Sequence, residues 1–559
     1  MNKVLDFDNS AERYLRLSNQ EIKKGNLVEG LVHAFNAWQK FESKDALINI
    51  ARIYKKLEIY ELSNEFWFLY LDRCSQKEAG FVYEELSMNY FYLKDSFSTS
   101  YYLHKKLVLD GDISDNYDKD ALEYIASLRE EDNKRKFTLF KNDEYQETDQ
   151  YKKACALLDE DKLEEALEIF EKIPVSSVNY AKAMETCACI KLALEDKAGA
   201  YKTLSTCIKN GHENLSIYFL MLNALLEDGE IEKAKYYYSK AVNIPTKDAL
   251  ENYKLGMFAI DLSDHENVKK YMGRVLKEQQ YNLSLRHVLA MAYINTGDYV
   301  GAYNQLKEQF KLFPEDEVCK YFLDIVGGVL FRGEECNVSV VDYPSGLDRK
   351  EEKRRIKIIE ELEKSDVKKQ IAQLKKQEVR KILEWGTIEA DESVSKKCAY
   401  VLCSVGDKFC YKVLKRALLI PTLSSDLKGV IVFLMASFSY SKKTGIVLNN
   451  MYRQFKPRKV VSNVEDEYYQ TAYALALSRS LQFGSNKVDK LAFTTRKVLV
   501  NLKNAPKEKF SRNEIALLVF HLSGISDELS IKKPYNIFSI SKSRFNYIID
   551  FYNNLEGEN

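Results

Sequence analysis

Histidine and cysteine are two residue types that commonly bind metal ions, and cysteine can also act as a nucleophile. The six histidines are dispersed: His33, His104, His212, His265, His287 and His521. None lies at ligand spacing from another histidine or from a cysteine. Of the ten cysteines, five fall into two groupings, Cys187 with Cys189, and Cys398 with Cys403 and Cys410. Side chains two positions apart on a helix point in different directions, so we expect Cys187 and Cys189 to pack in a core. The sequence therefore predicts no metal site and no cofactor.

Sequence motifs of common enzymes are also missing. The chain contains neither of the glycine-rich phosphate-binding motifs, G-x-x-x-x-G-K-[ST] and G-x-G-x-x-G, nor the zinc-protease motif H-E-x-x-H. The acidic pair Glu164-Glu165 falls on an outward helix face. The members of a nucleophile triad need not be adjacent in sequence, but nothing here raises one above background. We expect a protein that is not an enzyme, and an enzyme with its site in 387–559 is the least favoured alternative.

The amino-acid composition favours long helices, and its balanced charge favours neither anionic nor cationic partners. Lys+Arg and Asp+Glu both number 83, so the net charge is zero, which argues against bulk attraction to nucleic acid or an anionic membrane. Glycine (22) and proline (8) are scarce. The first residues lack the apolar stretch of a signal peptide, and no apolar run approaches the roughly 20 residues of a membrane span. Scattered cysteines then indicate reduced thiols in a cytoplasmic protein.

A pattern recurs every 34 residues in the middle of the chain. Stepping back from Gly297 gives Ser263, Gly229, Glu195 and Asp161. Five residues after each lies a small side chain: Ala302, Val268, Ala234, Ala200 and Ala166. Nine residues after lies a bulky one: Leu306, Met272, Tyr238, Leu204 and Phe170. Twelve residues after come Gln309, Val275, Ala241, Cys207 and Ile173, of which only Gln309 breaks the pattern.

These offsets differ by four and three residues, so the three positions share one face of a helix. The small residue lets that helix approach its partner closely, and the bulky one fills the space beside it. The glycine or polar residue that begins each step marks the turn between two helices. Prolines 314, 245 and 174 fall just behind three of the second helices, where a helix must stop. Each unit is thus a helix pair whose apolar flank must be buried on the next pair.

A helix pair with this period resembles the tetratricopeptide-repeat (TPR) family. Five units fit one frame over about 147–316, and Leu255-Gly256, Ala290 and Tyr293 match the family's first helix, although its initial Trp is absent. The resemblance implies an all-α fold, an α-solenoid of TPR helix pairs. It also implies a scaffold or adaptor that binds protein segments in a concave groove lined by the first helices.

The remaining chain is predicted to be helical as well, but less regular. We predict five parts: degenerate TPR units over 8–131, including a helix over 119–131; the regular array with a capping helix over 147–331; a loop and charged helix over 332–386; a second helical-repeat domain, HEAT-like or of divergent TPR type, over 387–530; and a tail with an amphipathic helix over 531–559. In the second domain, 427–438 and 445–455 are expected to form one helix pair. The charged segment 348–385 is interpreted as a solvated linker, with a coiled-coil contact and a nucleic-acid patch as alternatives.

The 34-residue frame also assigns groove positions by the resemblance. One row holds Tyr151, Phe219, Tyr253 and His287, with Glu185 in the second unit, and the next row holds Cys155, Cys189, Asn223, Met257 and Met291. The candidate peptide-groove residues are Tyr151, Phe219, Asn223, Tyr253, Met257, His287 and Met291. Only Asn223 matches the clamp by which some family members hold a terminal carboxylate, so such a clamp is not expected.

An aromatic and Met-rich row suits an apolar or amphipathic helical segment of a partner protein. The chain's own tail helix, with Phe545, Ile548, Ile549 and Tyr552 on one side, is a second candidate occupant. Neighbouring helices could instead cover the row. A different function also stays open, in which the chain is a peptide-responsive regulator whose C-terminal half is the output. Nucleic acid is not expected as a partner.

Overall fold

The computed structural model describes residues 10–111, 148–160, 162–336, 338, 343, 346–438, 440, 442–456, 467–483, 485, 488–502 and 509–557. Contacts divide the chain into two compact units. We call Phe137–Asp348 the array unit, and Met1–Lys136 together with Arg349–Asn559 the composite unit. None of the described helices combines the length and the apolar character that crossing a bilayer requires. The predicted helix over 119–131 lies outside the described residues.

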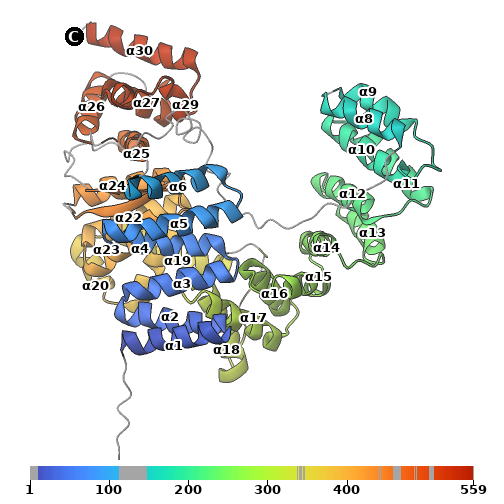
Figure 1. Ribbon diagram of the computed structural model, residues 1–559, viewed down its shortest axis with the longest axis horizontal. Helices are drawn as coiled ribbons and strands as arrows, with labels where there is room; N and C mark the ends of the chain where they lie inside the picture. The colour runs from blue at the N-terminus through green and yellow to red at the C-terminus, as the bar shows by residue number, and fades with distance from the viewer. Residues whose placement is uncertain are drawn as a thin grey trace, which may run out of the picture. The chain divides into compact units, whose positions relative to one another are not determined.

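The array unit consists of five helix pairs and a sixth leading helix. The pairs are α8 (Asp149–Asp159) with α9 (Leu163–Glu171), α10 (Tyr180–Ala193) with α11 (Lys197–Lys209), α12 (Leu215–Glu227) with α13 (Ile231–Ala241), α14 (Ala249–Asp261) with α15 (His265–Glu278), and α16 (Leu283–Asn295) with α17 (Tyr299–Leu312). Helix α18 (Glu317–Gly327), continued by a π-helical turn over Gly328–Arg332, packs on α17. Within this unit, Figure 1 shows the pairs following one another in chain order. The predicted helix pairs are confirmed.

The backbone conformation explains why glycine or a polar residue recurs at the turn between the two helices of each pair. The residues at this position that the structure describes all have positive φ, namely Glu195 (62°), Gly229 (71°), Ser263 (56°) and Gly297 (75°). A single left-handed residue turns the chain between two helices, and glycine adopts that conformation without strain. The following residue caps the second helix where it is an aspartate, as at Asp196, Asp264 and Asp298, but Glu230 makes no such bond. At Asp298 the backbone N–H of Gly301 donates to Oδ1 at 2.8 Å.

The repeated face of the second helices is the core of the array unit. All five small residues at the first offset are 0% exposed, and all five bulky residues at the second are buried. Gln309, the exception in the pattern, is also buried, and its Nε2 donates to Asp316 Oδ2 at 2.9 Å. Asp316 caps α18, so Gln309 hydrogen-bonds to the start of the capping helix instead of packing against another repeat.

The composite unit joins both ends of the chain. Its N-terminal part has three helix pairs: α1 (Ala11–Lys24) with α2 (Leu27–Phe41), α3 (Lys44–Lys56) with α4 (Tyr60–Leu71), and α5 (Gln76–Tyr92) with α6 (Ser96–Asp110). Its C-terminal part contains α19 (Arg349–Glu363), α20 (Val367–Gln373), α21 (Gln377–Ile388), α22 (Glu392–Val405), α23 (Lys408–Leu419), α24 (Ser425–Ser437), β1 (Thr444–Leu448), β2 (Met451–Phe455), α25 (Glu467–Gln482), α26 (Val488–Asn501), α27 (Arg512–Leu522), α28 (Ile525–Glu528), α29 (Pro534–Ile537) and α30 (Lys542–Gly557). In Figure 1 the blue N-terminal helices lie directly beside the yellow and orange helices of this part.

Direct contacts tie these two parts into one unit, unlike the separate domains predicted over 8–131 and 387–530. Helix α4 contacts α23 and β1. Asp72, at the end of α4, forms an ion pair with Lys415 at 2.7 Å and accepts the backbone N–H of Gly445 at 2.6 Å. Glu42 pairs with Lys412 at 3.2 Å. Such contacts join residues far apart in the chain, which a local sequence pattern does not reveal.

Residues 445–455 form a β-hairpin, so the prediction of a helix there is wrong. Strands β1 and β2 pair antiparallel, with Leu448 opposite Met451. The turn residues Asn449 (φ 46°) and Asn450 (φ 62°) both have positive φ, which a two-residue hairpin turn of type I′ requires and asparagine tolerates. The buried strand β1 carries Ile446 and Val447, residues whose branched side chains favour a strand over a helix.

The charged segment 348–385 is not a solvated linker. Helix α19 packs on α21 and α22, and Ile359, Leu362, Leu374 and Ile382 are buried, whereas Val367 and Ile371 are each close to half exposed. The tail helix α30 also docks within the composite unit, against α26 and α27. Ile548 and Tyr552 are each 1% exposed. The tail is therefore not a free ligand for the predicted groove, because its apolar side is already buried.

Candidate functional site

The seven candidate peptide-groove residues divide into a buried and an exposed set. Tyr151, Phe219, His287 and Met291 are buried, whereas Asn223, Tyr253 and Met257 are exposed. The buried residues contact other rings of the array unit: Phe219 stacks on Phe258 at 5.6 Å between ring centroids, and Tyr151 meets Phe170 edge-on at 5.5 Å. As placed, these four side chains serve helix packing and offer no surface to a partner.

The capping helix accounts for burial at the end of the array. His287 of α16 meets Phe322 of α18 edge-on, with 5.8 Å between ring centroids. Its Nε2 is buried without a hydrogen-bond partner. Burial lowers the pKa of His287, and the carboxylate of Asp316 opposes that shift only in part. The imidazole is therefore neutral and acts as a packing group.

We expect this buried histidine to make the array unit acid-sensitive. Because the folded pKa lies below that of the unfolded chain, about 6.5, the unfolded chain takes up the proton first. The stabilising contribution is present above that value and is lost as the pH falls toward the folded pKa. Hydrogen exchange of the α16 amides, corrected for intrinsic rates, should show protection falling between about pH 7.5 and 5.5. His287→Phe should flatten this fall, and an unchanged pH profile in the variant would assign the effect to other groups.

The exposed residues form a small surface on the first helices. Cys189 of α10, Asn223 of α12 and Met257 of α14 are exposed and are spaced by 34 residues, so they hold equivalent positions in three consecutive pairs. Tyr253 lies one turn before Met257, and both side chains are 38% exposed. Helices α10, α12 and α14 contact one another in succession. We call Cys189, Asn223, Tyr253 and Met257 the first-helix patch.

Charged side chains border the first-helix patch. Lys254 Nζ lies over the ring of Phe219, 5.4 Å from its centroid. Glu185 accepts a hydrogen bond from Asn214 Nδ2 at 2.9 Å. Burial raises the pKa of the Glu185 carboxyl, while Asn214, Lys182 and Lys254 act in the opposite direction. Lys182 and Lys254 are both exposed, so the patch has a cationic margin around an apolar centre.

The cysteines that the structure describes lie apart from other metal-ligating side chains or are packed in the core. All ten are free thiols, and no cluster of three metal-ligating side chains occurs among the described residues. Cys187 is buried, but Cys189 is exposed, so the prediction of core packing is wrong for Cys189. Side chains two positions apart on a helix point in different directions, and only one of these two points into the core. Cys398, Cys403 and Cys410 are buried, and burial raises the pKa of each thiol. They are packed thiols rather than activated nucleophiles.

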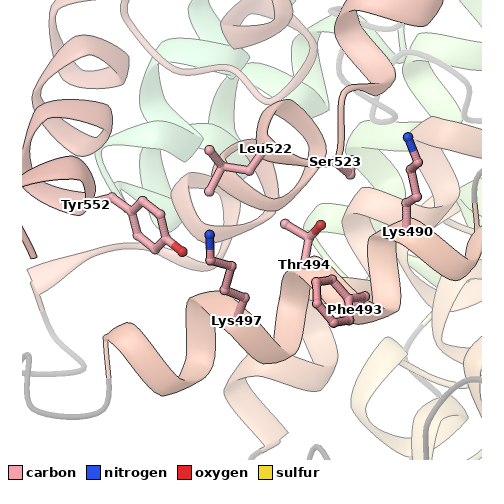
Figure 2. Close-up of a pocket in the computed structure, with 7 residues that line it drawn as sticks. All are labelled: Lys490, Phe493, Thr494, Lys497, Leu522, Ser523 and Tyr552. Atoms are coloured by element: carbon pink, nitrogen blue, oxygen red, sulfur yellow. The ribbon is translucent and has the colours of Figure 1, made fainter. Parts of the chain in front are cut away.

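A separate hollow lies in the composite unit between α26, α27 and α30 and has a volume of about 480 Å³. Figure 2 shows Lys490, Phe493, Thr494 and Lys497 along one helix, with Leu522, Ser523 and Tyr552 opposite. Phe493 is 71% exposed. The described lining residues include no carboxylate or imidazole, and Lys490, Lys497 and Tyr552 are the ionisable side chains among them. Sequence reasoning did not select this hollow, since its walls come from three helices that only the fold brings together.

Comparison with known proteins yields structural neighbours only. No family model and no curated protein matches the chain. The solved structure of YrrB, described as a TPR protein with an unusual peptide-binding site, matches 31% of this chain and 89% of its own, at 16% identity and a TM-score of 0.25. Yeast Tom70 matches 98% of this chain and 96% of its own, at 12% identity and a TM-score of 0.26. In the array unit itself, five helix pairs share a 34-residue spacing and bury small residues at equivalent positions.

Proposed function

We propose that this chain is a protein-interaction scaffold whose first-helix patch binds an apolar or amphipathic segment of another protein. The observation that carries the proposal is the exposure of Tyr253 and Met257, each 38%, on helices whose other apolar residues are mostly buried. Aromatic and Met side chains give a large and adaptable contact area. An amphipathic helix laid across successive first helices would cover them.

The charges beside the patch define the partner further. Lys182 and Lys254 are exposed, whereas Glu185 is half-buried and bonded to Asn214. An acidic residue next to the apolar face of the bound segment would meet these lysines. The occupant is a segment of another protein rather than the tail helix α30, because Ile548 and Tyr552 of the tail are buried against their own unit.

Truncating the patch is expected to weaken binding strongly. A binding segment is first selected from a displayed peptide library with the full chain, and its dissociation constant is then measured by fluorescence anisotropy. The double variant Tyr253→Ala with Met257→Ala should lose about 2 kcal/mol, or roughly thirtyfold in affinity, because two central contacts are removed.

A matched control separates binding at the patch from non-specific hydrophobic binding. Tyr236, on the second helix α13, is 58% exposed and lies outside the patch. Tyr236→Ala removes the same ring from the same unit and should leave the affinity unchanged. Equal affinity for the double variant and the unaltered chain would dispose of the first-helix patch as the binding surface.

A further inference from the structure

The composite unit contains a second, larger cavity of about 770 Å³. Its walls come from the end of α4, the start of α5, the last turns of α6, both strands of the β-hairpin, and the end of α25. It thus forms where the first helices of the chain meet the hairpin and helix of the C-terminal part. The volume lies within the range of small-molecule sites, roughly 300–1,000 Å³.

The charges lining this cavity are unbalanced. Four cationic side chains line it: Arg73, Lys105, Lys443 and Arg453. Asp72 is the one carboxylate among the described lining residues, and it is already held by Lys415 at 2.7 Å and by the Gly445 N–H at 2.6 Å. The Asp72–Lys415 pair is neutral, so the cavity keeps an excess of positive charge.

Three of these cations form no direct ion pair within the described residues, although Glu42 and Asp72 attract Arg73 from a greater distance. Arg73 stacks over Trp38, with its guanidinium carbon 4.4 Å from the ring centroid, and Arg453 lies 5.7 Å from the ring centroid of Tyr101. Arg453 Nε is buried and makes no hydrogen bond. Lys443 is exposed at the rim. Leaving a buried guanidinium donor unsatisfied is unfavourable, so an acceptor from outside the chain is expected there.

An uncharged hydroxyl in the cavity wall also lacks a partner that a ligand could supply. Thr444 lines the cavity, is 1% exposed, and has a hydroxyl without a hydrogen-bond partner. Ser75 and Gln76, at the start of α5, also line it, but the Ser75 N–H and hydroxyl already donate to the Glu78 carboxylate at 2.8 and 2.9 Å, so they add no free donor. The tyrosines Tyr83 and Tyr452 add an aromatic wall.

We propose that this cavity binds a small molecule that carries two or more phosphate groups. Guanidinium groups donate paired hydrogen bonds that match phosphate oxygens, and the lysines add charge at the rim. One phosphate carries at most two negative charges, fewer than the three positive charges of Arg73, Lys443 and Arg453. Two or more phosphates, spread along the cavity, balance them. This site lies in the composite unit and does not depend on the first-helix patch.

Tripolyphosphate is the probe that tests this proposal, in metal-free buffer with the full chain. Isothermal titration should detect saturable binding that weakens with added salt, because screening reduces ionic contacts. Lys443→Met, which removes an exposed charge without disturbing the core, should weaken binding about tenfold, as expected for a charged hydrogen bond. Arg453→Met should weaken it at least as much.

The neighbouring Lys442 provides the matched control. It is exposed, adjacent in sequence to Lys443, and outside the cavity lining. Lys442→Met should bind tripolyphosphate as the unaltered chain does. Absence of binding by the unaltered chain would overturn the proposal, as would an equal loss in Lys442→Met and Lys443→Met. Tighter binding of an acidic peptide of the same net charge would overturn the assignment to phosphate. If Arg453→Met fails to fold, Lys443→Met still decides.

Discussion

Replacing Tyr102 by phenylalanine should lower the free energy of unfolding of the composite unit by about 2–4 kcal/mol, since the variant leaves two backbone groups unpaired. Tyr102 is fully buried on α6 and joins it to the β-hairpin. Its hydroxyl donates to the Asn450 carbonyl and accepts the Tyr452 N–H, the latter at 3.1 Å. Burial raises the pKa of Tyr102 well above its usual value, so the hydroxyl stays protonated and able to donate.

Tryptophan fluorescence measures this effect in the full chain. The three tryptophans, Trp38, Trp67 and Trp385, all lie in the composite unit, so denaturant unfolding followed at their emission ignores the array unit. Tyr92→Phe is the control, because Tyr92 is 50% exposed and loses the same hydroxyl. Its change should stay within about 0.5 kcal/mol. If both variants unfold at the same denaturant concentration, the Tyr102 hydroxyl does not bridge the hairpin.

The second large effect is expected at Gly429, where α24 crosses α25. A Cβ atom at this position would lie 2.3 Å from the Ala474 carbonyl oxygen and 3.0 Å from its carbon. Backbone cannot move aside as a side chain can, so Gly429→Ala must push the two helices apart. We expect a net loss of about 1–3 kcal/mol in the same fluorescence assay.

Gly80 gives the opposite expectation for the same substitution. It lies inside helix α5, and an added Cβ would meet nothing within 4 Å. Gly80→Ala should stabilise the composite unit by about 0.5–1 kcal/mol, because alanine favours the helix. Stabilisation by Gly429→Ala as well would mean that the close approach of α24 and α25 is absent in solution.

The sequence was sufficient to predict the array unit because its determinants are local and repeated. The small residue at Ala302 and its equivalents, the turn at Gly297 and the cap at Asp298 each act within one helix pair. Their 34-residue recurrence then identifies the stacking. The cap helix α18 was also visible as an apolar segment that follows Pro314.

Features that depend on distant contacts could not be predicted in this way. The hairpin over 444–455 is held by α4 and α6, and the hydrogen bond between Asp72 and Gly445 joins residues 373 positions apart. The one local signal is the pair Asn449-Asn450, which suits a tight turn between two strands. The cavity lined by Arg73 and Arg453 depends on the same long-range meeting of segments.

Burial decided which predicted groove residues remain candidates, and burial depends on neighbouring elements. Phe219 and Tyr253 occupy equivalent positions in the repeat frame, yet Phe219 is 5% exposed and Tyr253 is 38% exposed. Phe219 packs on Phe258 of the next first helix, whereas Tyr253 has no such ring beside it among the described residues. The frame therefore supplies the positions, and the identities of the surrounding side chains decide their accessibility.

The union of both chain ends in one unit has a consequence during protein synthesis. The helix pairs over 10–111 leave the ribosome long before the segments they pack against, because the Asp72–Gly445 contact spans 373 residues. At roughly 5–20 residues per second, the early helices wait about 20 to 75 seconds for the strands that cover them. During that interval their uncovered aromatic surface, including Phe68 and Tyr102, is a target for chaperones. A stop codon anywhere before β1 would leave the same surface permanently bare.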